Sequence, residues 1–308
     1  MTRIKAASRT FSQHPRLRAE ILAHFPNTAF NENGVAFDKS GLIEYLDDAD
    51  GAVIGLELID DEVLAACPRL RIVAKYGVGL DGIDTEACTR RGVAIGWTGG
   101  VNRRSVSEMA LAFMISLSRN LYPTSIQLKG GVWHKSGGAQ LSGKTVGIIG
   151  LGNIGTDLAG LLAPFGCRLL GNDIEDRTEV CRTLGITHVD KDTLFAESDV
   201  VTFHVPLTPE TRHLVDRQVL EQMKPTAILI NTARGPIVRE ADLKRALVEG
   251  TIAAAALDVF EVEPPVDHDF VSLPNLFCTP HIGGNAEEAV LAMGMSAIGH
   301  LKRHFLAT

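Results

Sequence analysis

Three ionisable side chains, Arg234, Glu263 and His281, each follow an apolar run that predicts a buried strand. Ligands of open α/β sheets bind beside the carboxyl ends of the strands, so the three could converge on one cleft. An imidazole exchanges protons near neutral pH, a carboxylate can orient the ring, and a guanidinium forms a planar fork that matches a carboxylate ligand. Taken singly, the arginine could be a surface turn residue, the glutamate a solvated loop acid, and the histidine an ordinary loop residue beside Pro280.

A glycine-rich turn is the strongest signal among the elements that would position these side chains. Gly150, Gly152 and Gly155 form G-x-G-x-x-G between a predicted strand and a predicted helix. The first glycine allows a sharp turn, the second lets backbone approach a pyrophosphate, and the third lets helix pack on strand. Asp173 ends the next predicted strand, where a carboxylate can bond ribose hydroxyls and repel a 2′-phosphate. The pattern predicts NAD rather than NADP, although Arg177 lies near and the aspartate could be a solvated turn acid.

Apolar runs alternate with helical patterns along the chain, which is typical of an α/β protein. One series precedes the glycine-bearing segment GWTGGVN, and a second runs from TVGIIG through CRLLGND, DVVTFHV, TAILINT and AAALDVF, as in a doubly wound parallel sheet. Helices are expected from Ser105, as N-cap, to about Leu121, and from Ala286 to about Phe305. We predict a domain of residues 100–285 inserted in a smaller domain of residues 1–99 plus 286–308.

Length and composition exclude several classes of protein. The 308 residues are 45% hydrophobic and 22% charged, as in a soluble globular protein of two domains. A net charge of −7 without a basic run argues against nucleic-acid binding. The apolar stretches are too short to span a membrane, and the first residues lack a signal-peptide pattern, so a cytoplasmic protein is expected. The five cysteines are scattered without a C-x-x-C pair, so we expect reduced thiols and no metal site.

The segments NTARGPIV, LDVFEVEPP and CTPHIGG, with HVPLTPETRHLV and YGVGLDGID, closely resemble the D-isomer-specific 2-hydroxyacid dehydrogenase family, phosphoglycerate dehydrogenase-like members in particular. The resemblance covers essentially the whole chain. It implies two Rossmann-like domains, a doubly wound NAD-binding domain inserted in a smaller flavodoxin-like substrate domain. It also implies hydride transfer between NAD and a small D-2-hydroxyacid or 2-keto acid. His281 would be the acid/base, Glu263 its carboxylate partner, and Arg234 the anchor for the substrate carboxylate and carbonyl.

Further contacts follow from the resemblance residue by residue. Besides the three glycines and Asp173, the cofactor contacts would be Asn153, Ile154, His204, Pro206, Thr208, Thr232, Ala233, Asp258, His281 and Gly283. Besides Arg234, the substrate contacts would be Lys75, Tyr76, Gly77, Val78, Gly79 and Asn102. Plainer alternatives remain for several of them. Gly77 to Gly79 could form a tight turn, Asp258 could cap its strand, Asn102 could lead into a helix, and Lys75 could be an exposed strand-end lysine.

The exact substrate and the partners are less defined by the sequence. Lys75 could hold a second anionic group, which makes a phosphorylated acid similar to 3-phosphoglycerate one candidate substrate. The chain continues for 27 residues after His281, so the regulatory extension of some phosphoglycerate dehydrogenases is expected to be absent. The resemblance implies a homodimer formed through roughly Val101 to Leu141. An NAD-sensing, co-repressor-like protein and a phosphite-type dehydrogenase remain alternative functions.

Overall fold

The computed structural model describes residues 2–306, and the chain divides into two compact units. Unit 1 comprises Met1–Asn102 and Glu287–Thr308, and unit 2 comprises Arg103–Ala286. The chain therefore enters unit 2 once and returns to unit 1 once. The predicted boundaries, after residues 99 and 285, lie three residues and one residue earlier than these divisions.

Unit 1 is built on a parallel sheet with the strand order β2-β1-β3-β4-β5, which is the flavodoxin-like order. Side chains of β3 alternate between two cores, because Val53 packs with α1, α2 and α14 while its neighbours pack with α3, α4 and α5. The strands are β1 (Ile4–Ala6), β2 (Ala29–Phe30), β3 (Gly51–Ile54), β4 (Ile72–Lys75) and β5 (Ala94–Gly96). The helices are α1 (Arg9–Gln13), α2 (Pro15–His24), α3 (Lys39–Leu46), α4 (Asp61–Ala66), α5 (Thr85–Arg91) and α14 (Glu287–Leu306).

Unit 2 is built on a parallel sheet with the strand order β12-β11-β10-β9-β6-β7-β8. The order reverses between β9 and β6, and such a switch point is where open α/β sheets bind ligands. The strands are β6 (Thr145–Ile149), β7 (Arg168–Asn172), β8 (Ile186–His188), β9 (Val200–Phe203), β10 (Ile228–Asn231), β11 (Ala254–Leu257) and β12 (Leu276–Cys278). The helices are α6 (Arg103–Ser118), α7 (Leu121–Lys129), α8 (Asn153–Leu162), η1 (Ala163–Phe165), α9 (Thr178–Leu184), α10 (Lys191–Glu197), α11 (Arg217–Gln222), η2 (Gly235–Ile237), α12 (Glu240–Glu249) and α13 (His268–Val271).

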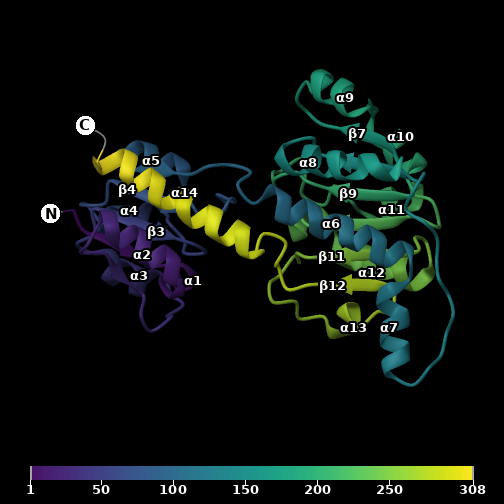
Figure 1. Cartoon of the computed structure of the whole chain (residues 1–308), viewed down its shortest axis with the longest axis horizontal. Coiled ribbons are helices and arrows are strands. Elements are labelled where there is room, and N and C mark those ends of the chain that lie inside the picture. Colours follow the sequence, from purple (N-terminus) through teal and green to yellow (C-terminus); the bar gives the residue numbers. More distant parts are fainter. Residues whose placement is uncertain (1, 307–308) are drawn as a thin grey trace. The chain divides into compact units, whose positions relative to one another are not determined.

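Helices cover both faces of the unit 2 sheet (Figure 1). On β9, Val200 packs into a core with α6, α8 and α9, whereas Val201 and Phe203 pack with α10, α11 and α12. Strands that are buried on both faces read as continuous apolar runs, which is why the sequence showed them clearly. The predicted α/β class with two parallel sheets is confirmed.

The long helix after the first glycine-bearing segment differs from its prediction. Helix α6 begins at Arg103, so Ser105 lies inside the helix and is not its N-cap. The Ser105 hydroxyl instead donates a hydrogen bond to the Gly283 carbonyl (2.6 Å) and accepts one from the Ala286 amide (3.2 Å). The start of α6 is thereby fastened to the HIGGN segment, where the chain leaves unit 2.

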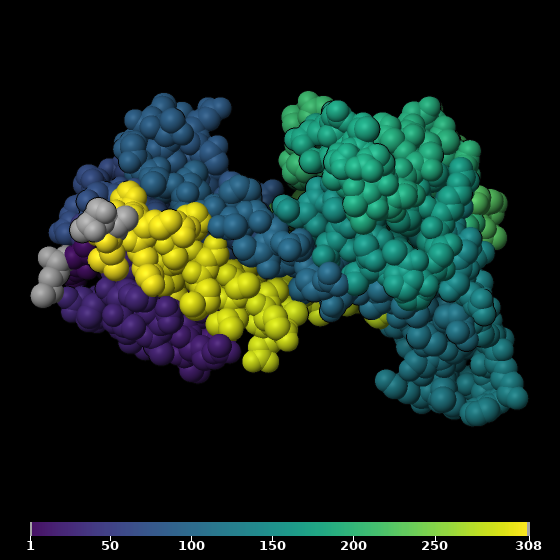
Figure 2. Space-filling model, turned by 45° about the horizontal axis from the view of Figure 1, so that its top comes forward, coloured from purple at the N-terminus to yellow at the C-terminus, as the bar shows by residue number. Residues whose placement is uncertain are grey.

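Helix α7 and the residues after it project from the body of unit 2 (Figures 1 and 2). No residue of α7 is buried. The large apolar side chains exposed along this stretch are Leu121, Ile126, Leu128, Val132 and Trp133. No helix within residues 2–306 has both the length and the apolar content needed to cross a membrane. The same residues contain no group of three His, Cys, Asp or Glu side chains arranged to hold a metal ion.

Candidate active site

The candidate residues of unit 2 follow six neighbouring strands of one parallel sheet. Because parallel strands end at the same edge, these residues share the carboxyl edge of the sheet, where ligands of this architecture bind. Three of the strands, β10, β11 and β12, lie on the same side of the switch point, and they are followed by Arg234, Glu263 and His281. The order along the edge is His281 after β12, Glu263 after β11, Arg234 after β10, His204 after β9, Gly150 after β6 and Asp173 after β7.

The imidazole of His281 is paired with the carboxylate of Glu263. Nδ1 of the ring lies 2.7 Å from Oε2, and the other oxygen, Oε1, accepts the Phe260 amide at 3.1 Å. An ionised carboxylate only accepts hydrogen bonds, so this contact requires a hydrogen on Nδ1 and leaves Nε2 outside the pair. Both side chains are partly exposed, His281 to 46% and Glu263 to 38%. Glu263 therefore fixes the orientation of the imidazole, and both side chains are accessible to a reactant.

Asp258 holds the segment that carries His281. Its buried carboxylate accepts hydrogen bonds from the Thr279 hydroxyl (2.6 Å) and from the amides of Ile282 (2.8 Å) and Gly283 (2.7 Å). The His281 amide donates to the Asp258 carbonyl at 2.8 Å, and the histidine has a φ of 53°, which L residues rarely adopt. Asp258 thus imposes the local conformation. Its contact with the cofactor, which the resemblance implies, stays a prediction.

Asn231 shapes the turn of Arg234. At the buried end of β10, the Asn231 side-chain amide donates to the Arg234 carbonyl (2.8 Å) and its oxygen accepts the Ala233 amide (3.0 Å). The guanidinium in turn donates from Nη1 to the Ala233 carbonyl at 2.6 Å. Side-chain hydrogen bonds to the backbone define this turn locally, so the arginine starts from a fixed point at the strand end.

The turn of Arg234 and the loop of Glu263 are in backbone contact at Gly235. A Cβ atom at Gly235 would lie 1.9 Å from the carbonyl carbon and oxygen of Phe260, so only glycine fits. The loop is also held at Glu261, whose amide donates to Glu240 (2.5 Å) and whose carboxylate meets His213 Nε2 at 2.8 Å.

Burial raises the pKa of Glu240, and the neighbouring carboxylates of Glu261, Asp267 and Glu263 raise it further.

The role of Gly235 and the residues that hold the loop at Glu261 were not foreseen from the sequence. Gly235 is the one with a signal that could have been read, because it stands next to a candidate ligand-binding arginine at a strand end.

The glycine turn has the geometry that a dinucleotide needs. Gly150 adopts a φ of 94°, and a Cβ there would lie 2.5 Å from the His204 carbonyl oxygen. A Cβ at Gly155 would lie 2.0 Å from the Gly150 carbonyl oxygen, so the helix packs directly on the turn. A Cβ at Gly152 would meet open space, and no side chain caps α8, which begins at Asn153 followed by Ile154. The first amides of α8 therefore have room for an anion.

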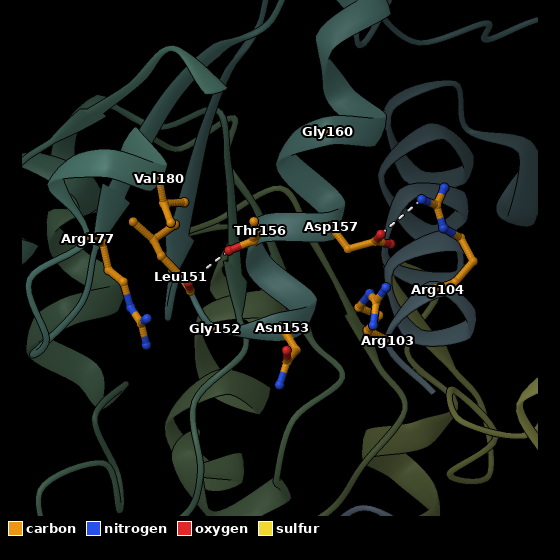
Figure 3. A pocket seen from close by; sticks show the side chains of 10 residues that line it. All are labelled: Arg103, Arg104, Leu151, Gly152, Asn153, Thr156, Asp157, Gly160, Arg177 and Val180. Atoms are coloured by element: carbon orange, nitrogen blue, oxygen red, sulfur yellow. Dashed lines mark hydrogen bonds and ion pairs between the residues drawn. The ribbon is translucent and has the colours of Figure 1, made fainter. Parts of the chain in front are cut away.

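Asp173 is oriented as a hydrogen-bond acceptor beside this turn. Its Oδ2 accepts the Leu151 amide at 2.7 Å and its Oδ1 accepts the Glu175 amide at 2.9 Å. A carboxylate has about four lone-pair positions, so each oxygen keeps one for a ribose hydroxyl. A cavity of about 500 Å³ adjoins the turn and is lined by Gly152, Asn153 and Arg177 among others (Figure 3).

Two buried polar atoms also suit a bound ligand. Within residues 2–306, neither His204 Nδ1 nor Thr232 Oγ1 has a hydrogen-bond partner, although both are sealed from solvent. The other ring nitrogen, His204 Nε2, lies 3.0 Å from the Thr202 hydroxyl, and burial lowers the pKa of His204 to about 3, so the ring is neutral. Unsatisfied buried polar atoms are costly, and polar groups of a dinucleotide would satisfy them. With the open glycine turn, they show that the residues present fit NAD.

The remaining cofactor contacts of the prediction lie at the same edge. Pro206 and Thr208 form a turn closed by Thr211, whose hydroxyl donates to the Pro206 carbonyl (2.7 Å) and accepts the Thr208 amide (2.7 Å). Ala233 and Gly283 are buried in the turns after β10 and β12. Their contacts with a cofactor stay predictions.

The predicted substrate residues of unit 1 form a separate group after β4. Lys75 is only 7% exposed, and its ammonium donates to the Gly55 carbonyl. The alternative of an exposed strand-end lysine is therefore wrong. Tyr76 is buried with its ring edge against Phe11, at 5.4 Å between centroids.

The loop that follows Tyr76 is anchored inside unit 1. Gly77 has a φ of 153°, and the Val78 carbonyl accepts the Trp97 indole N–H at 2.7 Å. Gly79 is half-buried in the same loop. Asn102, at the end of the first segment of unit 1, has a buried Oδ1 without a hydrogen-bond partner in the described chain. Roles in substrate binding stay predictions for all of these residues.

Comparison with known proteins agrees with this geometry. Residues 111–283 match the model of the D-isomer specific 2-hydroxyacid dehydrogenase, NAD binding domain. The chain is 37% identical to a hydroxypyruvate reductase of Thermotoga maritima over 268 residues, which cover 85% of this chain and 86% of that protein. It is 38% identical to a D-3-phosphoglycerate dehydrogenase of Methanocaldococcus jannaschii over 277 residues, which cover 88% of this chain and 53% of that protein. The chain thus spans about half the length of its phosphoglycerate dehydrogenase relatives.

Solved structures have the same fold over the whole chain. A structure from a Polaromonas species, described as a putative D-isomer specific 2-hydroxyacid dehydrogenase, has a TM-score of 0.91 at 26% identity and covers 100% of this chain and 97% of that one. A glyoxylate reductase from Paecilomyes thermophila has a TM-score of 0.87 at 27% identity and covers 98% and 94%. Together with the family model, these matches confirm the resemblance and the NAD-binding domain. The chain belongs to the D-isomer-specific 2-hydroxyacid dehydrogenase family.

Proposed function

We propose that the chain is an NAD-dependent oxidoreductase that interconverts a small D-2-hydroxyacid and its 2-keto acid. The observation that carries the proposal is the 2.7 Å contact between His281 Nδ1 and Glu263 Oε2. It supplies an oriented acid/base at the carboxyl edge of a sheet that also carries a dinucleotide turn. Membership of the family and a fold match over the whole chain support the same reaction class.

The protein residues would handle the proton and the substrate anion. During reduction of a keto acid, Nε2 of the protonated His281 would donate to the oxygen that becomes the hydroxyl. Glu263 would stabilise the imidazolium before the transfer and keep the ring oriented after it. Arg234, on the neighbouring strand end, would bind the substrate carboxylate and polarise the carbonyl. When bound, the nicotinamide supplies or accepts the hydride.

Several residues of unit 2 support binding of the cofactor. The amides after Gly152 would hold the pyrophosphate, and Asp173 would accept the adenosine ribose hydroxyls. Thr232 and His204 have buried polar atoms that a bound dinucleotide would satisfy. All four residues belong to unit 2. Gly152 and His204 follow β6 and β9, which flank the switch point, and Asp173 and Thr232 follow the next strands outward, β7 and β10.

We propose an unphosphorylated acid of the glyoxylate or hydroxypyruvate type as the substrate. Curated relatives carry the names hydroxypyruvate reductase, glyoxylate reductase and D-3-phosphoglycerate dehydrogenase, so the names alone leave both classes open. The burial of Lys75 against the Gly55 carbonyl favours the unphosphorylated class, because an ammonium held there is not displayed to solvent. Arg234 would supply the carboxylate contact that both classes need.

We also propose that the protein works as a homodimer. Five large apolar side chains are exposed along α7 and the residues after it, and a second copy would cover them. Large contiguous apolar surfaces on soluble proteins usually mark interaction sites. These side chains lie within the region that the resemblance assigns to the dimer contact.

A spectrophotometric panel tests the reaction. NADH and NADPH are supplied with glyoxylate, hydroxypyruvate, pyruvate and 3-phosphohydroxypyruvate. Wild type should oxidise NADH with at least one of the unphosphorylated acids, and His281→Asn should lower kcat by about 10²- to 10⁴-fold, as expected for loss of a general acid. His268→Asn, which alters a histidine on α13, is the matched control and should retain wild-type kcat. No turnover with any acid would contradict the proposal and favour an NAD-sensing protein.

A further inference from the structure

The cavity beside the glycine turn contains an arginine that is shared by two carboxylates. Arg177 Nη2 lies 2.6 Å from Glu175 Oε2, and its Nε lies 3.5 Å from Asp173 Oδ2. Figure 3 shows Arg177 on one side of the turn formed by Gly152 and Asn153, close to Leu151. A guanidinium at this place is the kind of group that recognises a phosphate.

We propose that Glu175 determines the choice of coenzyme by occupying Arg177, so that the chain discriminates against a 2′-phosphate with two acids instead of one. This inference rests on the proposed NAD-dependent function. Asp173 bonds the ribose hydroxyls and repels a phosphate there, as the sequence already predicts. The structure adds that the nearby cation is neutralised, which the sequence did not show.

The hydrogen bonds of Asp173 explain why the second acid is needed. Its two oxygens are fixed by the amides of Leu151 and Glu175, so the carboxylate cannot turn away from the ribose position. Arg177 is restrained as well, because its Nη2 is paired with Glu175 at 2.6 Å and its side chain is only 29% exposed. Its Nε lies 3.5 Å from Asp173 Oδ2 and makes no hydrogen bond within the described residues. If Glu175 were absent, Nη2 would be released near Asp173, the residue that we propose binds the ribose hydroxyls. A 2′-phosphate would then meet Asp173 and Arg177, whose charges cancel. In the wild type it meets Asp173, Glu175 and Arg177, whose charges sum to −1.

The location of Glu175 fits a determinant of specificity more than a structural residue. Its side chain is 66% exposed, and its amide rather than its carboxylate supports Asp173. Replacement by glutamine keeps the backbone contact and removes only the charge. Ion pairs of this exposure are worth up to about 1 kcal/mol, so the expected change in binding is about two- to fivefold.

Binding to the full chain can be measured by calorimetry with 5′-AMP and 2′,5′-ADP, which carry the adenosine end without any redox chemistry, and with NADH and NADPH. Glu175→Gln should tighten binding of 2′,5′-ADP and NADPH about two- to fivefold while AMP and NADH change by less than 1.5-fold. Glu175→Gln combined with Arg177→Met should lose the gain. Glu179→Gln is the matched control, because it also removes one exposed acid from this stretch but one that pairs with Arg182.

The outcomes separate the inference from the function on which it rests. An equal gain in Glu179→Gln would show a general charge effect and overturn the role of Glu175. A gain that persists without Arg177 would overturn it as well. Normal NADH binding with an unchanged preference in Glu175→Gln would refute only the inference. Failure of the wild type to bind both NADH and AMP would refute the proposed function and the inference together.

Discussion

Replacing Gly235 by alanine should disturb stability and activity together, because this glycine is where two loops of the candidate site meet. The added Cβ would lie 1.9 Å from the carbonyl carbon and oxygen of Phe260 and 2.4 Å from the Glu261 amide nitrogen. All three are backbone atoms, so no side chain can rotate to make room. Overpacking of a well-packed interior costs about 1–3 kcal/mol, and this contact should reach about 3 kcal/mol.

The expected loss of stability can be converted into a melting temperature. For a unit of this size, about 3 kcal/mol corresponds to a decrease in Tm of roughly 6–12 °C. A backbone shift of about 1 Å between the turn of Arg234 and the loop of Glu263 would lower kcat with a 2-keto acid by about 100-fold. Calorimetry or circular dichroism gives the first quantity, and steady-state kinetics at saturating NADH gives the second.

Gly160 provides the control, since it lies inside α8 and a Cβ there meets nothing within 4 Å. Gly160→Ala should be neutral or stabilise by up to about 1 kcal/mol, because alanine is the better helix former. If Gly235→Ala melted within 2 °C of wild type and retained its kcat, the backbone contact with Phe260 would not be what fixes the turn of Arg234 against the loop of Glu263.

Three further predictions concern other parts of the site. Glu263→Gln keeps an acceptor oxygen but loses the charge that stabilises the imidazolium, so kcat should fall about 10- to 100-fold with KM within threefold; an unchanged kcat would exclude the pair from catalysis. Burial lowers the pKa of His204 to about 3, so the unfolded chain takes up this proton first as pH falls below about 6.5. The contribution of the neutral, buried His204 to the free energy of unfolding is fully present above that pH. It declines by up to about 1.4 kcal/mol per pH unit as the pH falls toward 3. Urea titrations at pH 7, 6 and 5 should show this slope in wild type and not in His204→Asn, and equal slopes would contradict it. Trp133→Asp should yield monomers by light scattering, while Val248→Asp, at an exposed apolar position on α12, should stay dimeric; dimers in both variants would place the interface elsewhere.

Much of the fold could be predicted because its physical causes are local. Strands buried on both faces appear as apolar runs, and parallel strands place the residues that follow them at one edge, which brought Arg234, Glu263 and His281 into one hypothesis. Helix ends were less predictable. Ser105 has the composition of an N-cap, yet it lies inside α6 and bonds the Gly283 carbonyl, since tertiary contacts decided its role. Lys75 could have been an exposed strand-end lysine and is instead buried, because the sequence does not show which polar strand-end residue finds a buried acceptor.

The contacts between the loops after β10, β11 and β12 could not be predicted from the sequence. They explain how the candidate site keeps its geometry. Each of the loops after β10, β11 and β12 is joined to its neighbour: Gly235 to Phe260 by backbone contact, and Asp258 to Gly283 by a hydrogen bond of 2.7 Å. The contact between Glu263 and His281 is therefore one of several that bind the same two loops. Loss of either partner should leave the backbone of the other in place, whereas changes at the loop contacts should act on all three ionisable residues at once and give strongly non-additive double mutants. Both residues of the proposed acid/base pair belong to unit 2, while the substrate residues implied by the resemblance lie mostly in unit 1. If these proposed roles hold, substitutions in unit 1 should change substrate preference without altering the residues proposed to handle the proton.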